Sequence, residues 1–181
     1  MDFEVITGGM VTGARVGSIS QIAGYISSAY KNVEETSGVL FGEAYLSGLL
    51  KDNSVVMDSV PPSKAVEVVK QLNPAIQIPF VHALQKAHYF EGKDYNAEST
   101  YQYLCELFNL DNDRFIELWN SEEIAYRTNQ NFQWSAQAGI SGFPTTLLEY
   151  QQQYYLLAQG FLPLDQLEER LAKALAAAES A

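Results

Sequence analysis

Cysteine is almost absent from this chain, because Cys105 is the only one among its 181 residues. A single thiol cannot form an internal disulfide, so the fold is not stapled by a disulfide framework. The chain is long enough to bury a sizeable core without such cross-links. We therefore expect a globular protein held together by apolar packing.

Basic residues and long apolar runs are also scarce. Eleven Lys and Arg stand against 22 Asp and Glu, for a formal net charge of -11, which argues against nucleic acid and anionic membrane surfaces as partners. No apolar stretch approaches the roughly 18–20 residues of a membrane span. The first residues lack the basic flank and apolar core of a signal peptide. We therefore expect a cytoplasmic chain with neither nucleic acid nor membrane as partner.

Patterns that bind metals or cofactors are missing as well. His82 and His88 are six residues apart, about 240° of rotation on a helix, whereas a metal-binding pair needs i and i+4. The glycine-rich stretch at residues 8–17 fits neither phosphate-binding fingerprint, and no G-x-S-x-G elbow is present. We expect no metal and no cofactor, and interpret both histidines as surface or partly packed residues.

Cys105 has the sequence surroundings of a core residue. Tyr101, Leu104 and Phe108 lie at i−4, i−1 and i+3 from it, which is one face of a helix. A reactive thiol needs a cation or a helix N-terminus to lower its pKa, but Cys105 is late in its predicted helix and precedes Glu106. The prediction is a buried, structural cysteine.

Helices are predicted over most of the chain. Apolar periodicity, capping residues and prolines indicate helical segments at residues 18–37, 42–50, from the rigid entry at 59–63 to about 72, 74–90, 97–108, 111–119 and 121–139. Gly38 supplies a C-terminal stop for the first of them. Pro79 is expected to kink or divide the fourth, because its ring and missing N–H disrupt a helix interior.

Strands are predicted only towards the two ends. Residues 3–7 have the pattern of a short strand that Gly8 and Gly9 end. Residues 145–150 and 154–159 form a predicted hairpin joined by three glutamines, and a last helix opens at Pro163, with fraying expected from Ala176. Strands at both ends with helices between them indicate an α/β chain.

The stretch at residues 139–148 organises the rest, because a glycine-spaced loop enters Pro144 directly before a strand. Gly142-Phe143-Pro144-Thr145, followed by a hairpin and a last helix, resembles the cis-proline corner of the thioredoxin fold. Together with residues 3–10 at the front and 154–160 behind the corner, it resembles the DsbA-like thiol-disulfide oxidoreductases over nearly the whole chain.

This resemblance implies an α/β protein with a thioredoxin-like core, incomplete at the N-terminus, and a large all-helical insertion. The core would comprise residues 1–14 and 121–181, and the insertion residues 15–120. The base rate for X-Pro bonds favours trans, but the resemblance implies a cis bond between Phe143 and Pro144. It also assigns substrate binding to Phe143 and Pro144, where an extended peptide or thiol protein substrate would pair with the backbone.

The resembled enzymes work through a Cys-x-x-Cys at the N-terminus of their first helix, where the helix end stabilises the attacking thiolate. This chain has no such pair and starts at what looks like the second strand. One hypothesis is that the chain is a DsbA-like oxidoreductase or isomerase that lacks its catalytic segment. It would then have no catalytic residue and no activity as given. The alternative is a non-catalytic peptide-binding module that retains the cis-proline groove. An unrelated helical enzyme with a small sheet is a third.

The missing segment has a further implication under the resemblance. The first strand would lie between residues 3–7 and 145–150, so its absence would leave two strand edges unpaired. Buried unpaired backbone groups are costly, and an open edge invites another chain. Self-association or low stability of the isolated chain is therefore expected.

Overall fold

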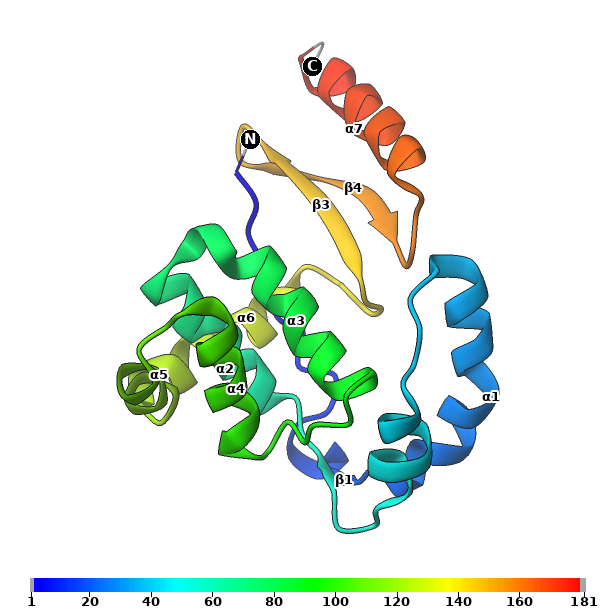
Figure 1. Ribbon diagram of the computed structural model, residues 1–181. Helices are drawn as coiled ribbons and strands as arrows, with labels where there is room; N and C mark the ends of the chain where they lie inside the picture. The colour runs from blue at the N-terminus through cyan, green and yellow to red at the C-terminus, as the bar shows by residue number, and fades with distance from the viewer. Residues whose placement is uncertain (1, 180–181) are drawn as a thin grey trace. The chain divides into compact units, whose positions relative to one another are not determined.

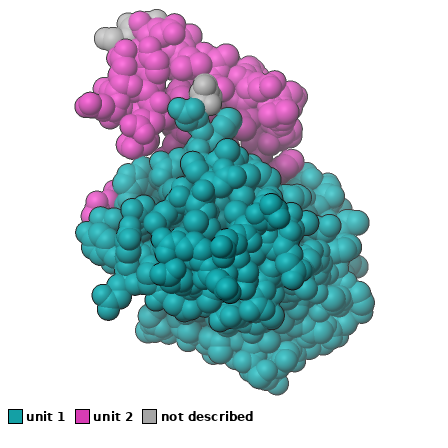
Figure 2. All heavy atoms as spheres, turned by 60° about the vertical axis from the view of Figure 1, so that its left-hand side comes forward, with its two compact units in different colours: residues 1–135 teal, residues 136–181 magenta. Residues whose placement is uncertain are grey.

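The computed structural model describes residues 2–179. They divide into two compact units, one up to Ser135 and one from Ala136 onward (Figure 2). The helices of the first unit are α1 (Ser20–Ser37), α2 (Val60–Leu72), α3 (Gln77–Tyr89), α4 (Glu98–Phe108) and α5 (Asn112–Trp119). Helix α6 (Glu122–Gln137) ends at the boundary between the units. Helices α2 to α5 pack together (Figure 1).

Shorter elements connect these helices. They are η1 (Gly13–Arg15), β1 (Gly17–Ser18), η2 (Ala44–Gly48), η3 (Leu49–Lys51), β2 (Val56–Met57) and η4 (Pro74–Ile76). The predicted helix at residues 42–50 is therefore one π-helical turn followed by a 3₁₀ turn. Strands β1 and β2 pair antiparallel with each other, and in the described chain they join no larger sheet.

Several predicted helix ends are confirmed by their caps. Gly38 has φ 74° and its N–H donates to Glu34 O, the left-handed stop that glycine favours. The Asp111 carboxylate accepts the Arg114 N–H at 2.9 Å, and Ser121 Oγ accepts the Ile124 N–H at 3.2 Å. These local bonds satisfy amides at the start of α5 and α6 that have no partner inside the helix.

Pro79 divides the fourth predicted helix, as expected. The segment breaks into η4 and α3, and Pro79 is the third residue of α3. In the first turn of a helix the missing proline N–H removes no intrahelical hydrogen bond. The break therefore lies before the proline rather than at it.

The first unit contains two apolar clusters. The larger lies among α2 to α6 and consists of Ala65, Val66, Val68, Val69, Phe80, Leu84, Tyr101, Leu104, Cys105, Phe115, Leu118 and Ile124. The smaller consists of Ile19, Tyr45, Leu50 and Val55, with α1 packed against it through Ile22, Ala23 and Ile26. The positions flanking Cys105 in the sequence therefore form part of the main core.

The strand predicted at residues 3–7 is wrong, because the described residues 2–9 contain no strand. Side chains of the helices bind this backbone instead. The Val5 N–H donates to Gln77 Oε1 at 2.8 Å, and Gln77 Nε2 donates to Phe3 O at 2.8 Å. Lys70 Nζ donates to Val5 O at 3.2 Å. A strand requires a neighbouring backbone edge, and here helices α2 and α3 supply the partners.

The second unit is a hairpin with one helix. Strand β3 (Thr145–Tyr150) pairs antiparallel with β4 (Gln153–Gln159), with an irregularity after Thr146. Helix α7 (Leu164–Glu179) packs on the hairpin (Figure 1). It remains helical through Glu179, so the fraying predicted from Ala176 is not observed within the described residues.

The hairpin turn differs from its prediction. Its two residues, Gln151 and Gln152, have φ values of 49° and 64°, and β4 already starts at Gln153. Two consecutive positive φ values match the twist that a two-residue hairpin requires. Glutamine is an unusual residue for this conformation, which is why the sequence indicated a longer turn.

No helix in the described part of the chain has the length and apolar character needed to cross a membrane.

Candidate functional site

The corner at Phe143 and Pro144 directly precedes β3. Their peptide bond is cis, as the resemblance predicts. The Pro144 carbonyl accepts the Gly160 N–H at 2.7 Å, and Thr145 Oγ1 donates to Gly142 O at 2.7 Å. The first hydrogen bond thus joins the corner to the residue that follows β4, and the second lies within the corner itself.

Phe143 keeps its backbone available for a partner. Its N–H and C=O make no hydrogen bond within the described part of the chain, and 38% of the residue's surface is exposed. Strand β3, which follows, has β4 as its sole ladder partner among the described residues. An extended peptide could therefore add to this edge through main-chain hydrogen bonds.

Cys105 lies in α4 with only 1% of its surface exposed. Burial raises the pKa of its thiol to about 11, and the negative charge of Asp111 adds to the effect. The thiolate is the nucleophilic form of cysteine, so at neutral pH this sulfur is both protonated and enclosed. The prediction of a buried, structural cysteine is confirmed.

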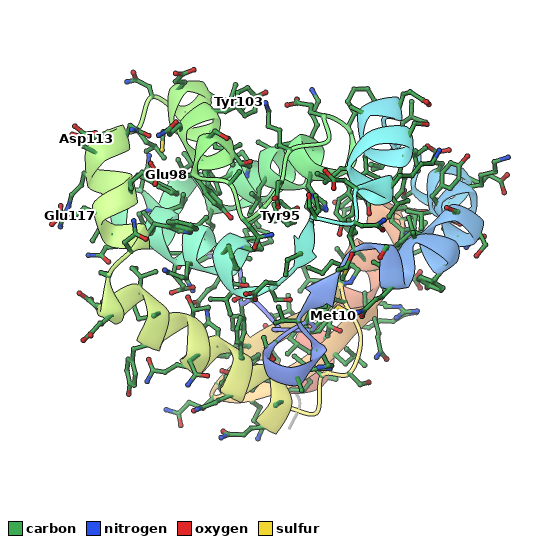
Figure 3. The ribbon with its side chains drawn as sticks, turned by 90° about the horizontal axis from the view of Figure 1, so that it is seen from below. Met10, Tyr95, Glu98, Tyr103, Asp113 and Glu117 are labelled. Atoms are coloured by element: carbon green, nitrogen blue, oxygen red, sulfur yellow. The ribbon has the colours of Figure 1, made fainter. Side chains whose placement is uncertain are left out.

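The two histidines have different environments. His82 is exposed, as predicted, but His88 is buried and stacks on Tyr95 with ring centroids 4.0 Å apart; Figure 3 labels Tyr95. Its Nδ1 lies 2.9 Å from Lys93 O, and burial lowers its pKa to about 4. The interpretation of His88 as a surface or partly packed residue is therefore wrong, because Tyr45 from η2 also packs against its ring.

A polar hollow of about 620 Å³ lies in the first unit. We call it the charged groove. It is lined by Glu4, Glu67, Lys70, Glu123, Tyr126, Arg127, Gln130 and Asn131. These residues come from the N-terminal segment, α2 and α6, so no sequence pattern indicates the groove. Within the described residues, no group of three or more His, Cys, Asp and Glu side chains is placed to hold a metal ion.

The known proteins that are similar to this chain were found among solved structures. No family model and no curated protein matches it. A Nitrosomonas europaea protein described as a candidate protein disulfide isomerase is 28% identical, with a TM-score of 0.79, over 86% of this chain and 74% of that one.

The cytosolic disulfide reductase DsbM from Pseudomonas aeruginosa is similar over a longer stretch. It is 25% identical with a TM-score of 0.80, over 97% of this chain and 84% of that one. The same reductase with GSH aligns at 23% identity and a TM-score of 0.77, over 96% and 84% of the two chains.

These neighbours agree with the architecture described above. They establish the α/β fold class expected from the resemblance, a thioredoxin-like core with a helical insertion. The cis corner before β3, the hairpin and the final helix stand in the order that the resemblance predicts. The chain is therefore similar in fold to DsbA-like thiol-disulfide oxidoreductases of the thioredoxin fold, as the resemblance predicts.

Proposed function

We propose that this chain takes part in protein thiol-disulfide chemistry by holding an extended polypeptide at Phe143 and Pro144. We further propose that the 181 residues as given do not exchange disulfides by themselves. The similarity to disulfide oxidoreductases supports a part in thiol-disulfide chemistry. The burial of Cys105, the one thiol of the chain, is the observation that supports the lack of disulfide exchange.

The chemistry of disulfide exchange explains why the chain as given would be inactive. A thiolate attacks a disulfide sulfur to form a mixed disulfide, and a further thiol must then release the product. Cys105 is protonated at neutral pH because burial raises its pKa to about 11, and its sulfur is enclosed by the main core. The chain as given contains no second thiol that could complete the cycle.

The proposal includes the domain organisation that the resemblance implies. Residues 1–14 and 121–181 would form the thioredoxin-like core, and residues 15–120 the insertion. The short pair β1 and β2 supports this division, because both strands fall within the insertion and pair only with each other among the described residues. Most of the apolar cluster around Phe80 and Tyr101 would then lie in the insertion, and Val5 and Ile124 of the core residues would pack against it.

A non-catalytic peptide-binding module is the second candidate function. Such a module would bind peptides at the same corner. The lack of a second cysteine supports it as much as it supports an inactive oxidoreductase. The DNA upstream of the first codon distinguishes the two. An in-frame strand followed by Cys-x-x-Cys supports the oxidoreductase, and a stop codon supports the module.

The neighbours also suggest where the chain works and with what. The Pseudomonas reductase is cytosolic and was solved with GSH, which favours a cytoplasmic location and a thiol substrate for this chain. Self-association remains a prediction, because β3 has one edge without a ladder partner in the described chain. Sedimentation velocity at micromolar concentration tests it, and a single monomeric boundary would refute it.

We expect the isolated chain to reduce insulin with dithiothreitol no faster than the uncatalysed blank. The reason is that the reaction needs an accessible, low-pKa thiol, and Cys105 is neither accessible nor acidic. The turbidity assay would be run in parallel on Cys105→Ala. If the wild type reduced insulin well above the blank and Cys105→Ala did not, the proposal that the chain is inactive would be refuted.

We expect an unfolded peptide, such as carboxymethylated insulin B chain, to bind at the corner. In an NMR titration the amide of Phe143 should shift, because its N–H is free to pair. Phe143→Ala should weaken binding by about 5-fold, the effect of removing one well-placed aromatic contact. Phe161→Ala, which removes another exposed ring of the same unit, should change the affinity less than about 2-fold. Saturable binding with an unmoved Phe143 amide and equal affinities would contradict the proposal.

A further inference from the structure

The segment at residues 3–7 has a backbone edge without partners. Gln77 and Lys70 bind the backbone of alternate residues in this segment. The N–H and C=O groups of Glu4 and Ile6, which lie between them, make no hydrogen bond with any described residue. In an extended chain, successive residues direct these groups to opposite sides. The helices therefore bind one side of the segment, and the other side is an open edge formed by the backbone of Glu4 and Ile6.

A small hollow of about 160 Å³ lies beside this segment, because Val5 and Thr7 form part of its wall. We call it the apolar hollow. The other apolar residues of its wall are Pro62, Val66, Val81, Leu84 and Tyr95. None of the lining residues is charged, so the hollow suits an uncharged, apolar group.

Thr7 carries a polar atom that has no partner. Its hydroxyl oxygen is buried and makes no hydrogen bond within the described part of the chain. A buried hydroxyl without a partner is unfavourable, although such a group can both donate and accept. The open edge and the Thr7 hydroxyl thus both have hydrogen-bonding capacity that the described residues do not use, and both lie at the apolar hollow.

We propose that the open edge binds an extended peptide as an added β-strand, and that this peptide places one apolar side chain in the apolar hollow. Main-chain hydrogen bonds with Glu4 and Ile6 would supply affinity, and the hollow would select the side chain. A peptide residue opposite Val5 or Thr7 directs its side chain to the same face of the strand pair as theirs. That face is the one on which the hollow lies.

The size and charge of the site specify the peptide further. An apolar cavity of about 150 Å³ accepts a benzene molecule, so the apolar hollow suits one side chain of the size of leucine or phenylalanine. The net charge of -11 favours a peptide with basic ends. All residues of the site lie in the first unit, so the proposal does not depend on the function proposed for the corner.

An NMR titration of the full chain with a short capped peptide tests the proposal. The peptide alternates leucine with threonine and has a lysine at each end. We expect saturable binding, shifts of the Glu4 and Ile6 amides, and hydrogen exchange at Ile6 that slows by about 10-fold or more. The Val5 amide already donates to Gln77 and should change less.

Two altered peptides separate the contributions of the side chain and the backbone. Replacing the leucines by serine should weaken binding by about 10-fold or more, because no apolar side chain then fills the hollow. Methylating the peptide's backbone nitrogens keeps its side chains but removes its donors, and should weaken binding by a similar factor.

Gln85→Trp tests the hollow from the side of the protein. Gln85 is exposed on α3 and lines the hollow, so a tryptophan there can occupy the hollow without replacing a core residue. It should weaken binding by about 10-fold or more. Gln71→Trp is the matched control, since Gln71 is exposed on α2 and is not among the described residues that line the hollow. It should change the affinity less than about 2-fold.

Circular dichroism shows whether each variant keeps its fold, and the altered peptides decide on the wild-type chain if Gln85→Trp does not fold. The proposal would be overturned by an absence of saturable binding, by equal affinity of the serine peptide, or by unchanged affinity in folded Gln85→Trp. Shifts at Phe143 with unmoved Glu4 and Ile6 amides would place the peptide at the corner instead. Protection of Ile6 that rises with protein concentration in the absence of peptide would assign the edge to a second copy, and would also overturn the proposal.

Discussion

Replacing Gly42 by alanine is expected to destabilise the first unit by about 3 kcal/mol, at the upper end of overpacking effects. A Cβ at this position would lie 1.8 Å from Phe90 O and 2.6 Å from Phe90 C. Both are backbone atoms, so no side-chain rotation relieves the overlap. The Gly42 N–H also donates to Tyr89 O at 3.0 Å, and this bond keeps the two segments close.

Urea denaturation measures the effect, and Gly24→Ala serves as its control. Gly24 is exposed within α1 and nothing lies within 4 Å of a Cβ built there. Alanine in an exposed helix interior should stabilise by about 0.5–1 kcal/mol. The two substitutions should therefore shift the midpoint in opposite directions. A Gly42→Ala midpoint at or above that of the wild type would show that the close approach to Phe90 is wrong.

Acidification is expected to remove up to about 3 kcal/mol of stability through His88, at about 1.4 kcal/mol per unit of pKa difference. Burial lowers its folded pKa from 6.5 to about 4, against smaller opposing effects of the Lys93 carbonyl and the Asp94 charge. Between these values the unfolded chain binds more protons than the folded one. The stabilisation is therefore complete above pH 6.5 and is lost as the pH falls towards 4.

Unfolding free energies at several pH values between 4 and 8 test this prediction. His88→Phe keeps an aromatic ring against Tyr95 but cannot be protonated, so its stability should fall less steeply with acid than that of the wild type. Its stability at pH 8 will be lower, because the Lys93 carbonyl loses its partner. His82→Gln, at the exposed histidine, should retain the wild-type slope. Identical slopes in the wild type and His88→Phe would assign the acid sensitivity to other groups.

Local signals in the sequence predicted most elements. Gly38, Asp111 and Ser121 indicated helix ends that the structure confirms. Each acts within a few residues of itself, through a left-handed cap or a side chain that accepts a backbone N–H. The loop and proline before β3 indicated the start of the strand for the same reason, since proline is suited to the first residue of a strand, whereas the cis bond at Pro144 was predicted from the resemblance. The burial of Cys105 followed from the apolar face of one helix.

The sequence by itself therefore determined most of the helices, the hairpin and the structural cysteine, because their signals lie within a few residues. Only the tertiary structure decided three other features. Residues 3–7 are bonded by Gln77 and Lys70 rather than by a strand, His88 is enclosed by Tyr45 and Tyr95, and Glu67 faces α6 across the charged groove. In each case at least one partner is distant in the chain, so the hydrogen bonding or burial depends on the tertiary structure rather than on a local pattern.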